Sequence, residues 1–491
     1  MKKKKKKLKI YSVLALILVI ITVFAVGTLT YFNVLPYKYL VPGIVVLAFI
    51  IFFIICMLCR KTKNYVKIIS VLLTIIIMGI EVAGINYAFG TITFFNKIFD
   101  IGVRTETYSV YVLDDSKYEK VKDLDNKKIS VYSPSDKAIE KLNKEISFKE
   151  KDYDNIDEAV TSVLDKDNDA IYVNSGLMEI YKESYDKAKK LRLVGSYDIT
   201  MKSNNKLKSV KVTEKPFAVY LSGIDTSGRV NKSARSDVNL LAVVNPVEGK
   251  VLIISIPRDY YVTLASKGAK DKLTHAGIYG GVLESANTVG KLLDTDVNYY
   301  ARVNFTSFVK IIDALGGIEV NVDRPDYRYN DSIDCGSNTI CEQNSQRQFG
   351  TKMIYIKPGK QTLSGEKALA YARNRHQFAG GDNARGKHQS QIIEGVINKA
   401  ISPAILTKYN KLLSSLQNGV MTNIEQKDIT DLVNMQLDKN IKWQIETISL
   451  TGTDSYNTTY STGGLKAYVM KPDEKSIANA KIKISEIMKA E

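Results

Sequence analysis

The sequence predicts an α/β protein that is attached to a membrane by three N-terminal helices. Three apolar stretches fall within the first 90 of its 491 residues, and each is long enough, at ~20 residues, to cross the hydrocarbon core as a helix. After them, short β-branched runs alternate with segments of helical spacing, a pattern typical of βα units. With 45% hydrophobic and 25% charged residues, the composition excludes a disordered or disulfide-dense chain.

The three apolar stretches are Ile10–Phe32, Leu40–Leu58 and Val66–Ala88. A cleaved signal peptide has one shorter apolar core, followed by small residues at the cleavage site. Because two further spans follow at once, the sequence favours a basic tail at residues 1–9 and three transmembrane helices within residues 10–90.

Basic residues set the expected orientation. Residues 1–90 hold twelve Lys and Arg and a single acid, so they carry most of the net charge of +17. The Lys2–Lys7 run and the basic cluster at 60–67 are expected in the cytoplasm, because the loop between the first two spans has only Lys38. The chain after about residue 91 is therefore expected outside the cell. A nucleic-acid-binding protein would carry its positive excess on a folded domain, and a short basic arm for nucleic acid is the weaker alternative.

Glu81 and the cysteines call for separate interpretations. Glu81 lies inside the third span, where it is either a functional intramembrane acid or a side chain that reaches the outer interface, and both readings stay open. Cys56 and Cys59 are expected to act as small apolar residues in the second span. Cys335 and Cys341 lie in a polar exterior loop, where a structural disulfide is plausible.

Residues 91–205 are predicted to form a small extracellular α/β accessory domain, in which no chemical constellation is recognisable. Strand-like runs at Ser109–Leu113, Lys128–Tyr132 and Ala170–Val173 alternate there with helical stretches. A larger α/β domain is predicted over residues 216–450, followed by a polar tail with a helical end at 451–491. The expected strands of the larger domain are 217–224, 239–244, 251–256, 297–303, 318–322 and 441–449, and its expected helices are 282–293, 306–315, 363–373, 389–400 and 429–437.

Two clusters of charged residues follow strand ends in the larger domain. Asp225 comes directly after a strand, and Arg235 and Asp237 follow shortly. Two carboxylates beside an arginine can hold a divalent cation, although this cluster alone favours a plain salt bridge between Asp and Arg. Arg258 and Asp259 follow the end of the expected strand at 251–256. Ligands gather at such strand ends in α/β sheets, and an arginine there is well placed to bind phosphate. The alternative to a phosphate site is an ion pair between the two side chains.

Two further clusters lie in loops. Lys272 and His275 precede a Gly-Gly pair, and a lone histidine is weak support for a ligand site. The richest cluster has Arg373, Arg375, Arg385 and Lys387 within fifteen residues, with Asp382 as the single acid, and it predicts an anion site. Residues 381–387 nearly match a phosphate-binding P-loop, but His follows where Ser or Thr is needed, and no strand precedes the segment.

Together the four clusters favour a site for a polyanion such as pyrophosphate. No Ser/His/Asp set, zinc motif or cysteine nucleophile is recognisable in the sequence. Arginines and a metal ion that stabilise charge developing on phosphorus need no protein nucleophile.

The order and spacing of these clusters resemble the LytR-CpsA-Psr (LCP) family of bacterial envelope proteins, over about residues 216–400. Three spans followed by a small extra domain are similar to the CpsA-like branch of that family. The set of motifs is specific, whereas each piece alone is weak. The matching pieces are Gly223-x-Asp225, Arg235-Ser236-Asp237, Ser255-Ile256-Pro257-Arg258-Asp259, Lys272-x-x-His275-Ala276-x-x-x-Gly280-Gly281, Asp313-Ala314-Leu315-Gly316-Gly317, Gly365-Glu366-x-Ala368-Leu369-x-Tyr371-Ala372-Arg373-x-Arg375 and Gly381-Asp382-x-x-Arg385.

The resemblance implies an LCP-type α/β/α domain with a central mixed sheet in the plasma membrane of a Gram-positive bacterium. It implies a transferase that moves a capsule- or teichoic-acid-type glycopolymer from a polyprenyl-pyrophosphate carrier to peptidoglycan by Mg-assisted phosphoryl transfer, with pyrophosphatase as a side activity and no nucleic-acid partner. In matching positions, Asp225 and Asp237 would hold Mg²⁺ or Mn²⁺. The implied catalytic residues are Asp225, Asp237, Arg235, Arg258, Asp259 and Asp382, and the implied pyrophosphate-binding residues are Arg235, Arg258, Arg373, Arg375, Arg385, Lys272 and Gln389.

One departure and two alternatives accompany this resemblance. The family usually has Arg-Gln where this chain has His388-Gln389, so head-group affinity is expected to be weaker or sensitive to pH. A membrane-anchored binding protein for polyprenyl phosphate or another polyanion, without turnover, would share every arginine. A membrane-anchored transcriptional regulator is the weakest reading, because nine N-terminal residues are too short to fold or to read DNA.

Overall fold

The computed structural model of the chain describes residues 2–32, 37–60, 62–99, 102–202, 207–225, 230–326, 338–347, 352–400 and 419–489. These residues divide into two compact units. The first unit holds the N-terminal helices up to Lys97 together with Glu425–Lys442. The second unit holds the remaining described residues, from Ile98 onward.

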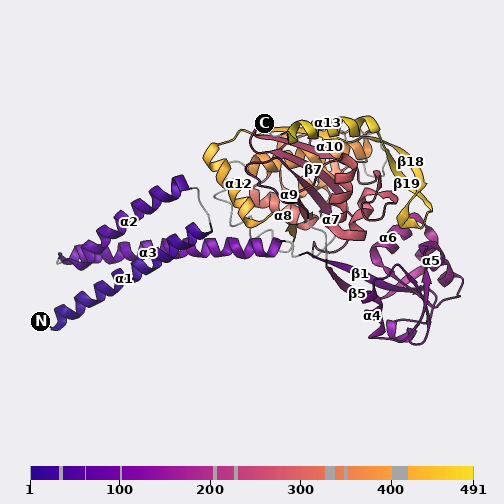
Figure 1. The fold of residues 1–491 in the computed structure, drawn as a ribbon, viewed down its shortest axis with the longest axis horizontal. Helices are drawn as coiled ribbons and strands as arrows, with labels where there is room; N and C mark the ends of the chain where they lie inside the picture. The colour runs from indigo at the N-terminus through magenta and orange to yellow at the C-terminus, as the bar shows by residue number, and fades with distance from the viewer. Residues whose placement is uncertain are drawn as a thin grey trace. The chain divides into compact units, whose positions relative to one another are not determined.

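The first unit contains the three apolar helices α1 (Lys2–Tyr31), α2 (Tyr37–Cys59) and α3 (Asn64–Ile98), drawn in indigo to purple in Figure 1. Each has a stretch long and apolar enough to cross a membrane. Large apolar side chains such as Phe49 are mostly exposed on these helices, as expected for surfaces that face lipid and not water.

Glu81 is buried between helices of this unit. The Thr22 hydroxyl on α1 donates a hydrogen bond of 2.6 Å to the Glu81 carboxylate on α3. The side chain therefore contacts a neighbouring helix, and both readings of its role remain predictions. A polar contact of this kind joins two helices that lipid-facing apolar side chains alone would not hold in register.

Helix α12 (Gln426–Lys439) also belongs to the first unit, although its sequence was expected to form part of the larger α/β domain. Lys38, at the start of α2, forms an ion pair of 3.0 Å with Asp438 and donates to the Leu437 carbonyl at 3.0 Å. The helix has few buried residues, so periodicity alone did not indicate which neighbour it packs on.

The second unit begins with a five-stranded sheet in the order β3-β2-β4-β1-β5. The central strands carry buried apolar runs and agree with the sequence prediction. The two edge strands, β3 and β5, were missed because their residues are largely polar and exposed, as edge strands can be. The elements are β1 (Val103–Leu113), β2 (Lys128–Tyr132), β3 (Lys149–Tyr153), β4 (Ala170–Asn174), β5 (Leu191–Lys202), α4 (Asp136–Asn143), α5 (Ile156–Leu164) and α6 (Ser175–Ser184).

The larger sheet of this unit has six strands in the order β16-β11-β6-β7-β8-β17. Strands β6 and β11 pair in parallel, as do β8 and β17, whereas β6–β7 and β7–β8 are antiparallel, so the sheet is mixed. Its strands are β6 (Phe217–Ile224), β7 (Val238–Asn245), β8 (Lys250–Ser255), β11 (Tyr299–Asn304), β16 (Val420–Thr422) and β17 (Gln444–Ser449).

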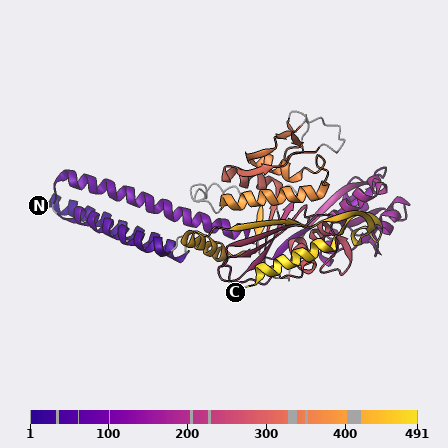
Figure 2. The same cartoon turned by 90° about the horizontal axis from the view of Figure 1, so that it is seen from above.

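Helices cover both faces of the larger sheet, which confirms the predicted α/β/α architecture. The orange α10 and the yellow α13 lie on opposite faces in Figure 2. On the α13 face, Tyr220, Leu241 and Ile254 join a core with side chains of α7 and α13. The helices are α7 (Leu273–Leu293) and α13 (Glu474–Met488) on that face, and α8 (Phe305–Leu315), α9 (Gly365–Arg373) and α10 (Gly381–Ala400) on the other.

Residues 451–491 are folded, so their interpretation as a polar tail is wrong for the described part of that segment. Strands β18 (Gly452–Thr458) and β19 (Lys466–Pro472) pair antiparallel, and α13 follows them. Ile477, Ala480 and Ile484 are buried at helical spacing in the core of the larger sheet. The apolar face is narrow, so the overall polarity of the segment concealed it.

The small and larger sheets share a packed boundary. Ile278 of α7 is 2% exposed and packs in the same core as Leu177 and Met178 of α6. The Asn155 side chain donates a hydrogen bond of 2.9 Å to the Gly463 carbonyl. Side chains of the small sheet can therefore reach a site formed by the larger one.

The structure describes three of the four cysteines, so it tests only part of what the sequence predicts for them. Cys56 and Cys59 are free. Cys341 is disulfide-bonded, and Cys335 lies outside the described residues, so the pairing of these two remains a prediction.

His388 is fully buried at the contact between α9 and α10. Its ring stacks on Tyr371 with centroids 4.2 Å apart and meets the edge of Phe378 at 4.4 Å. Burial lowers the pKa of His388 below its usual value, and Asp323, 3.6 Å away, opposes this only in part. The native protein thus favours the neutral ring.

We expect this burial to make the second unit lose stability as pH falls. Because the folded pKa lies below the unfolded value of about 6.5, the stabilisation is present above pH 6.5 and is lost as pH falls toward the folded pKa. The loss should approach ~1.4 kcal/mol per pH unit. Urea unfolding of the full chain in detergent, followed by fluorescence of its single tryptophan between pH 7.5 and 5, should show a slope that His388→Phe removes. His376→Phe is the matched control and should keep the slope; an unchanged slope in His388→Phe would contradict this account.

Candidate functional site

A cavity of about 1190 Å³ lies in the second unit between the larger sheet and helices α8–α10. One part of its wall is apolar, and another carries most of the arginines singled out in the sequence. Residues of the small sheet form a further wall. The apolar lining comes from strand side chains and from the facing helices: Leu221, Val238, Leu240, Ala301, Val303, Phe305, Phe308, Leu369, Ala372, Ile392 and Ile393.

Asp225 and Asp237 lie at the same edge of the larger sheet. Antiparallel pairing aligns Gly223 of β6 with Val238 of β7, and the Asp237 amide donates to the Gly223 carbonyl at 2.8 Å. Both carboxylates line the cavity. Asp237 forms an ion pair of 2.6 Å with Arg258, and Asp225 pairs with Arg347, a residue that the sequence reading did not single out.

The loop before Asp237 is held tightly against the rest of the domain. A side chain at Gly277 of α7 would come within 2.3 Å of the Ala234 carbonyl, so only glycine permits this approach. The fully buried guanidinium of Arg302 donates to the same carbonyl at 3.0 Å. Arg235, which lines the cavity, therefore follows a backbone group that is fixed from two sides.

Arg373 and Arg375 both line the cavity, as does Arg385. Two residues apart on a continuous helix, the first two would point about 200° from each other. Helix α9 ends at Arg373, and Asn374 is extended with φ −68° and ψ 124°. This change of direction allows both guanidinium groups to face the same space.

Asp382 lies behind these arginines and does not line the cavity. Its carboxylate accepts from Arg385 at 3.1 Å and from Arg375 at 3.3 Å. The side chain is 7% exposed. Asp382 therefore orients two arginines, and its sequence-based assignment as a catalytic residue becomes a positioning role.

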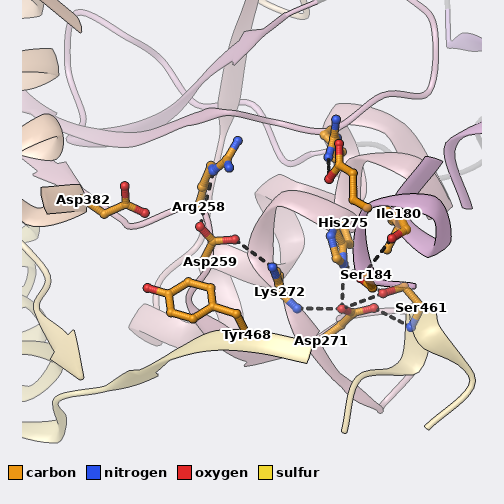
Figure 3. A network of polar contacts seen from close by, with 12 residues as sticks. Ile180, Ser184, Arg258, Asp259, Asp271, Lys272, His275, Asp382, Ser461 and Tyr468 are labelled. Carbon is orange, nitrogen blue, oxygen red and sulfur yellow. Dashed lines mark hydrogen bonds and ion pairs between the residues drawn. The ribbon is translucent and has the colours of Figure 1, made fainter. Parts of the chain in front are cut away.

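Asp259 and Lys272 form a second supporting layer and do not line the cavity. Figure 3 shows the Asp259 carboxylate between Arg258 and Lys272. Asp259 accepts from Arg258 at 3.3 Å and from Lys272 at 3.2 Å. Burial works against ionisation, but Arg258 and Lys272 lower the pKa of Asp259 to about 2. The ionised carboxylate therefore fixes Arg258. Gln389 does line the cavity, and its amide donates to the Ala372 carbonyl at 3.2 Å.

His275, Asp271 and Ser461 meet in a buried cluster that could be mistaken for a catalytic triad (Figure 3). The His275 Nδ1 atom lies 2.8 Å from the Asp271 carboxylate and 2.9 Å from the Ser461 hydroxyl. In a triad the serine and the aspartate contact different ring nitrogens, whereas here they share one. The cluster joins the turn that carries Ser461 to α7 by hydrogen bonds. His275 therefore has a structural contact here, in agreement with the sequence analysis, which did not assign it as a ligand.

His388 is absent from the cavity lining. Its ring lies between two aromatic side chains, so the expectation that it makes head-group binding pH-sensitive has no structural basis.

The carboxylates at the cavity suit a divalent cation held jointly with a substrate. Among the described residues, no group of three or more His, Cys, Asp or Glu side chains could hold a metal by itself. Mg²⁺ commonly takes one or two carboxylates and completes its shell with phosphate oxygens and water. Asp225 and Asp237 at one sheet edge, beside arginines that line the same cavity, fit that donor set.

Sequence reasoning missed the parts of the site that come from the small sheet. Thr107, Ser109, Ser175, Glu179 and Glu183 line the cavity, and Glu183 forms an ion pair with Arg235. Hydroxyls and acids of this kind are common on solvated surfaces, so nothing in the sequence distinguished them.

Comparison with known proteins gives one consistent result. A model described as the LytR_cpsA_psr family matches residues 178–481. TagU of Bacillus cereus, named a polyisoprenyl-teichoic acid–peptidoglycan teichoic acid transferase, is 32% identical over 232 residues, which are 47% of this chain and 68% of that protein. TagU of Bacillus subtilis is 33% identical over the same shares. The solved structure of B. subtilis TagV is 29% identical, covers 56% of this chain and 98% of that one, and has a TM-score of 0.43. The chain belongs to the LytR_cpsA_psr family.

Proposed function

We propose that this protein transfers a glycopolymer of the teichoic-acid or capsule type from a polyprenyl-pyrophosphate carrier to peptidoglycan. The observation that carries the proposal is one cavity in which six arginines and the carboxylates of Asp225 and Asp237 adjoin an apolar wall. A lipid pyrophosphate has this division between a multiply charged head and an apolar tail. The transferase names of the TagU relatives support the same reaction class.

The arginines suit the head group. Guanidinium groups bind phosphate oxygens in pairs of parallel hydrogen bonds and stay charged at any physiological pH. Arg258 is held by two carboxylates, and Arg375 and Arg385 share Asp382. These acids fix the direction of each fork before substrate arrives.

The apolar wall suits the lipid. Phe305 and Phe308 of α8 and Ile392 and Ile393 of α10 line the cavity opposite strand residues such as Leu221. The three apolar helices anchor the chain in a membrane, where a polyprenyl carrier resides. The distribution of Lys and Arg supports an outward-facing second unit.

The chain's residues would act on the phosphorus that bears the glycopolymer. An acceptor hydroxyl of peptidoglycan attacks this phosphorus and gives up its proton to solvent. The bond from phosphorus to the bridging oxygen breaks, and polyprenyl phosphate leaves with that oxygen. The arginines stabilise the negative charge that develops on the phosphoryl and leaving oxygens. Mg²⁺ or Mn²⁺ bound at Asp225 and Asp237 would neutralise further charge. Water in place of the acceptor would give pyrophosphatase activity.

A binding protein without turnover is the second candidate function. Asp225 and Asp237 already have arginine partners, so their charges are compensated without a metal. A labelled lipid-linked glycopolymer offered to the full chain with peptidoglycan distinguishes the two. Magnesium-dependent release of polyprenyl phosphate, with label in peptidoglycan, supports the transferase, whereas tight binding without release supports the second candidate.

We expect Asp225→Ala and Asp237→Ala each to lower metal-dependent transfer by roughly 100-fold or more, because charge on phosphorus is then poorly stabilised. Removal of Mg²⁺ with EDTA should reduce the unaltered protein to a similar rate. The measurement is transfer rate against Mg²⁺ concentration. Asp186→Ala, which removes an exposed acid, is the control and should keep full activity. Full activity of both cavity variants in EDTA would exclude the metal site.

Arg373 and Arg375 test whether the head group is bound by paired hydrogen bonds. We expect Ala at either position to weaken binding of polyprenyl pyrophosphate by ~1.5–3 kcal/mol. Lys keeps the charge but loses the planar fork, so it should restore only part of this. Affinity is measured by titration in detergent, with Arg192→Ala in the small sheet as the control. Full rescue by Lys at both positions would show that a simple electrostatic patch suffices.

A further inference from the structure

One wall of the cavity carries hydroxyls and carboxylates instead of arginines. Its residues come from the small α/β domain, from the five-stranded sheet and from helix α6. Thr107, Ser109 and Tyr111 alternate along β1 and so lie on one face of that sheet. Ser109 is paired in register with Ser196 of β5, which also lines the cavity. The Ser109 hydroxyl lies 2.7 Å from that of Ser196 and 2.6 Å from that of Ser175 on α6. Three hydroxyls are thus joined in one short network.

Helix α6 extends this wall. Ser175, Glu179 and Glu183 are four residues apart in succession and therefore lie on one face of the helix. All three line the cavity, and both glutamates are exposed. The face thus presents carboxylates as well as a hydroxyl to the space that the arginines share.

The ion pair between Glu183 and Arg235 joins the two kinds of wall. Arg235 stands among the phosphate-binding arginines, so whatever is bonded to a bound pyrophosphate lies within reach of α6. The wall itself does not suit phosphate, because its carboxylates would repel it. Both groups suit a sugar instead. Carboxylates accept hydrogen bonds from sugar hydroxyls, and protein hydroxyls both accept such bonds and donate them. Burial raises the pKa of Glu179, and Arg235 opposes this rise.

We propose that Ser175, Ser196, Glu179 and Glu183 form a carbohydrate subsite that binds the sugar bonded to the pyrophosphate. The small α/β domain would thereby select which glycopolymer enters the cavity. This inference rests on the proposed function, since it assumes that a lipid pyrophosphate occupies the arginines.

The test compares ligands with and without the sugar. Polyprenyl pyrophosphate alone is one probe, and the same lipid bearing a single glucose, galactose or N-acetylglucosamine is the other set. The full chain in detergent should bind at least one sugar-bearing lipid about 10-fold more tightly than the bare lipid, the gain expected from hydrogen bonds to a charged group. Ser196→Ala should remove most of this gain and leave affinity for the bare lipid within about twofold. Glu179→Gln should also remove most of the gain, without weakening binding of the bare lipid. Both positions are exposed, so the substitutions leave the core intact.

Matched variants separate this role from a general effect of charge. Glu158→Gln removes an exposed acid of α5 that does not line the cavity, and it should retain the full gain. Arg235→Ala should weaken binding of both kinds of lipid. Equal losses of affinity for both kinds of lipid in Glu179→Gln would overturn the inference. Equal affinity of the unaltered protein for the bare and the sugar-bearing lipids would also overturn it. In both cases the proposed function would stand. If the unaltered protein binds none of them, the proposed function fails and the subsite with it.

Discussion

Arg258 is the residue on which the geometry of the cavity depends. It leaves the end of β8 and contacts Asp237 at the start of β7 and Asp259 directly beside it. Asp259 in turn holds Lys272, whose neighbour Asp271 binds His275 and Ser461. A chain of charged contacts therefore runs from the cavity through the sheet edge to α7 and the C-terminal turn. Because removal of one partner leaves the others buried and uncompensated, such a network tolerates little change.

The same network explains why several charged residues can share one region without substrate. Six arginines line the cavity, and like charges that share one space repel each other. Acids behind or beside five of them offset this repulsion: Asp237 and Asp259 for Arg258, Asp382 for Arg375 and Arg385, Glu183 for Arg235, and Asp225 for Arg347. Two of the acids, Asp259 and Asp382, are withdrawn from the cavity, so the face offered to a polyanion remains positive there.

Sequence reasoning predicted most of the buried framework. Strand β6 is a continuous apolar run and helix α8 has strong periodicity, and the limits of both agree closely with expectation. The edge strand β3 and the hairpin of β18 and β19 were not recognised, because their side chains are mostly polar and their pairing depends on distant neighbours. For the site, the motifs identified five of the six arginines that line the cavity and missed Arg347. They did not separate Arg258, which lines it, from Asp259, which lies behind it, because side-chain direction at a strand end is decided by packing. The wall from α6 required knowledge of how the two sheets contact each other.

The close contact between Gly277 and the Ala234 carbonyl has a consequence for the thermodynamics of recognition. A loop that must become ordered on binding lowers affinity by the conformational entropy it loses. Here the backbone before Arg235 is already fixed by α7 on one side and by the Arg302 guanidinium on the other. The backbone before Arg235 therefore loses little conformational entropy on binding. Most of the favourable energy of contacts between Arg235 and an anion then contributes to affinity. A methyl group at residue 277 would thus act at a distance, by making the recognition of an anion depend on a loop that is free to move.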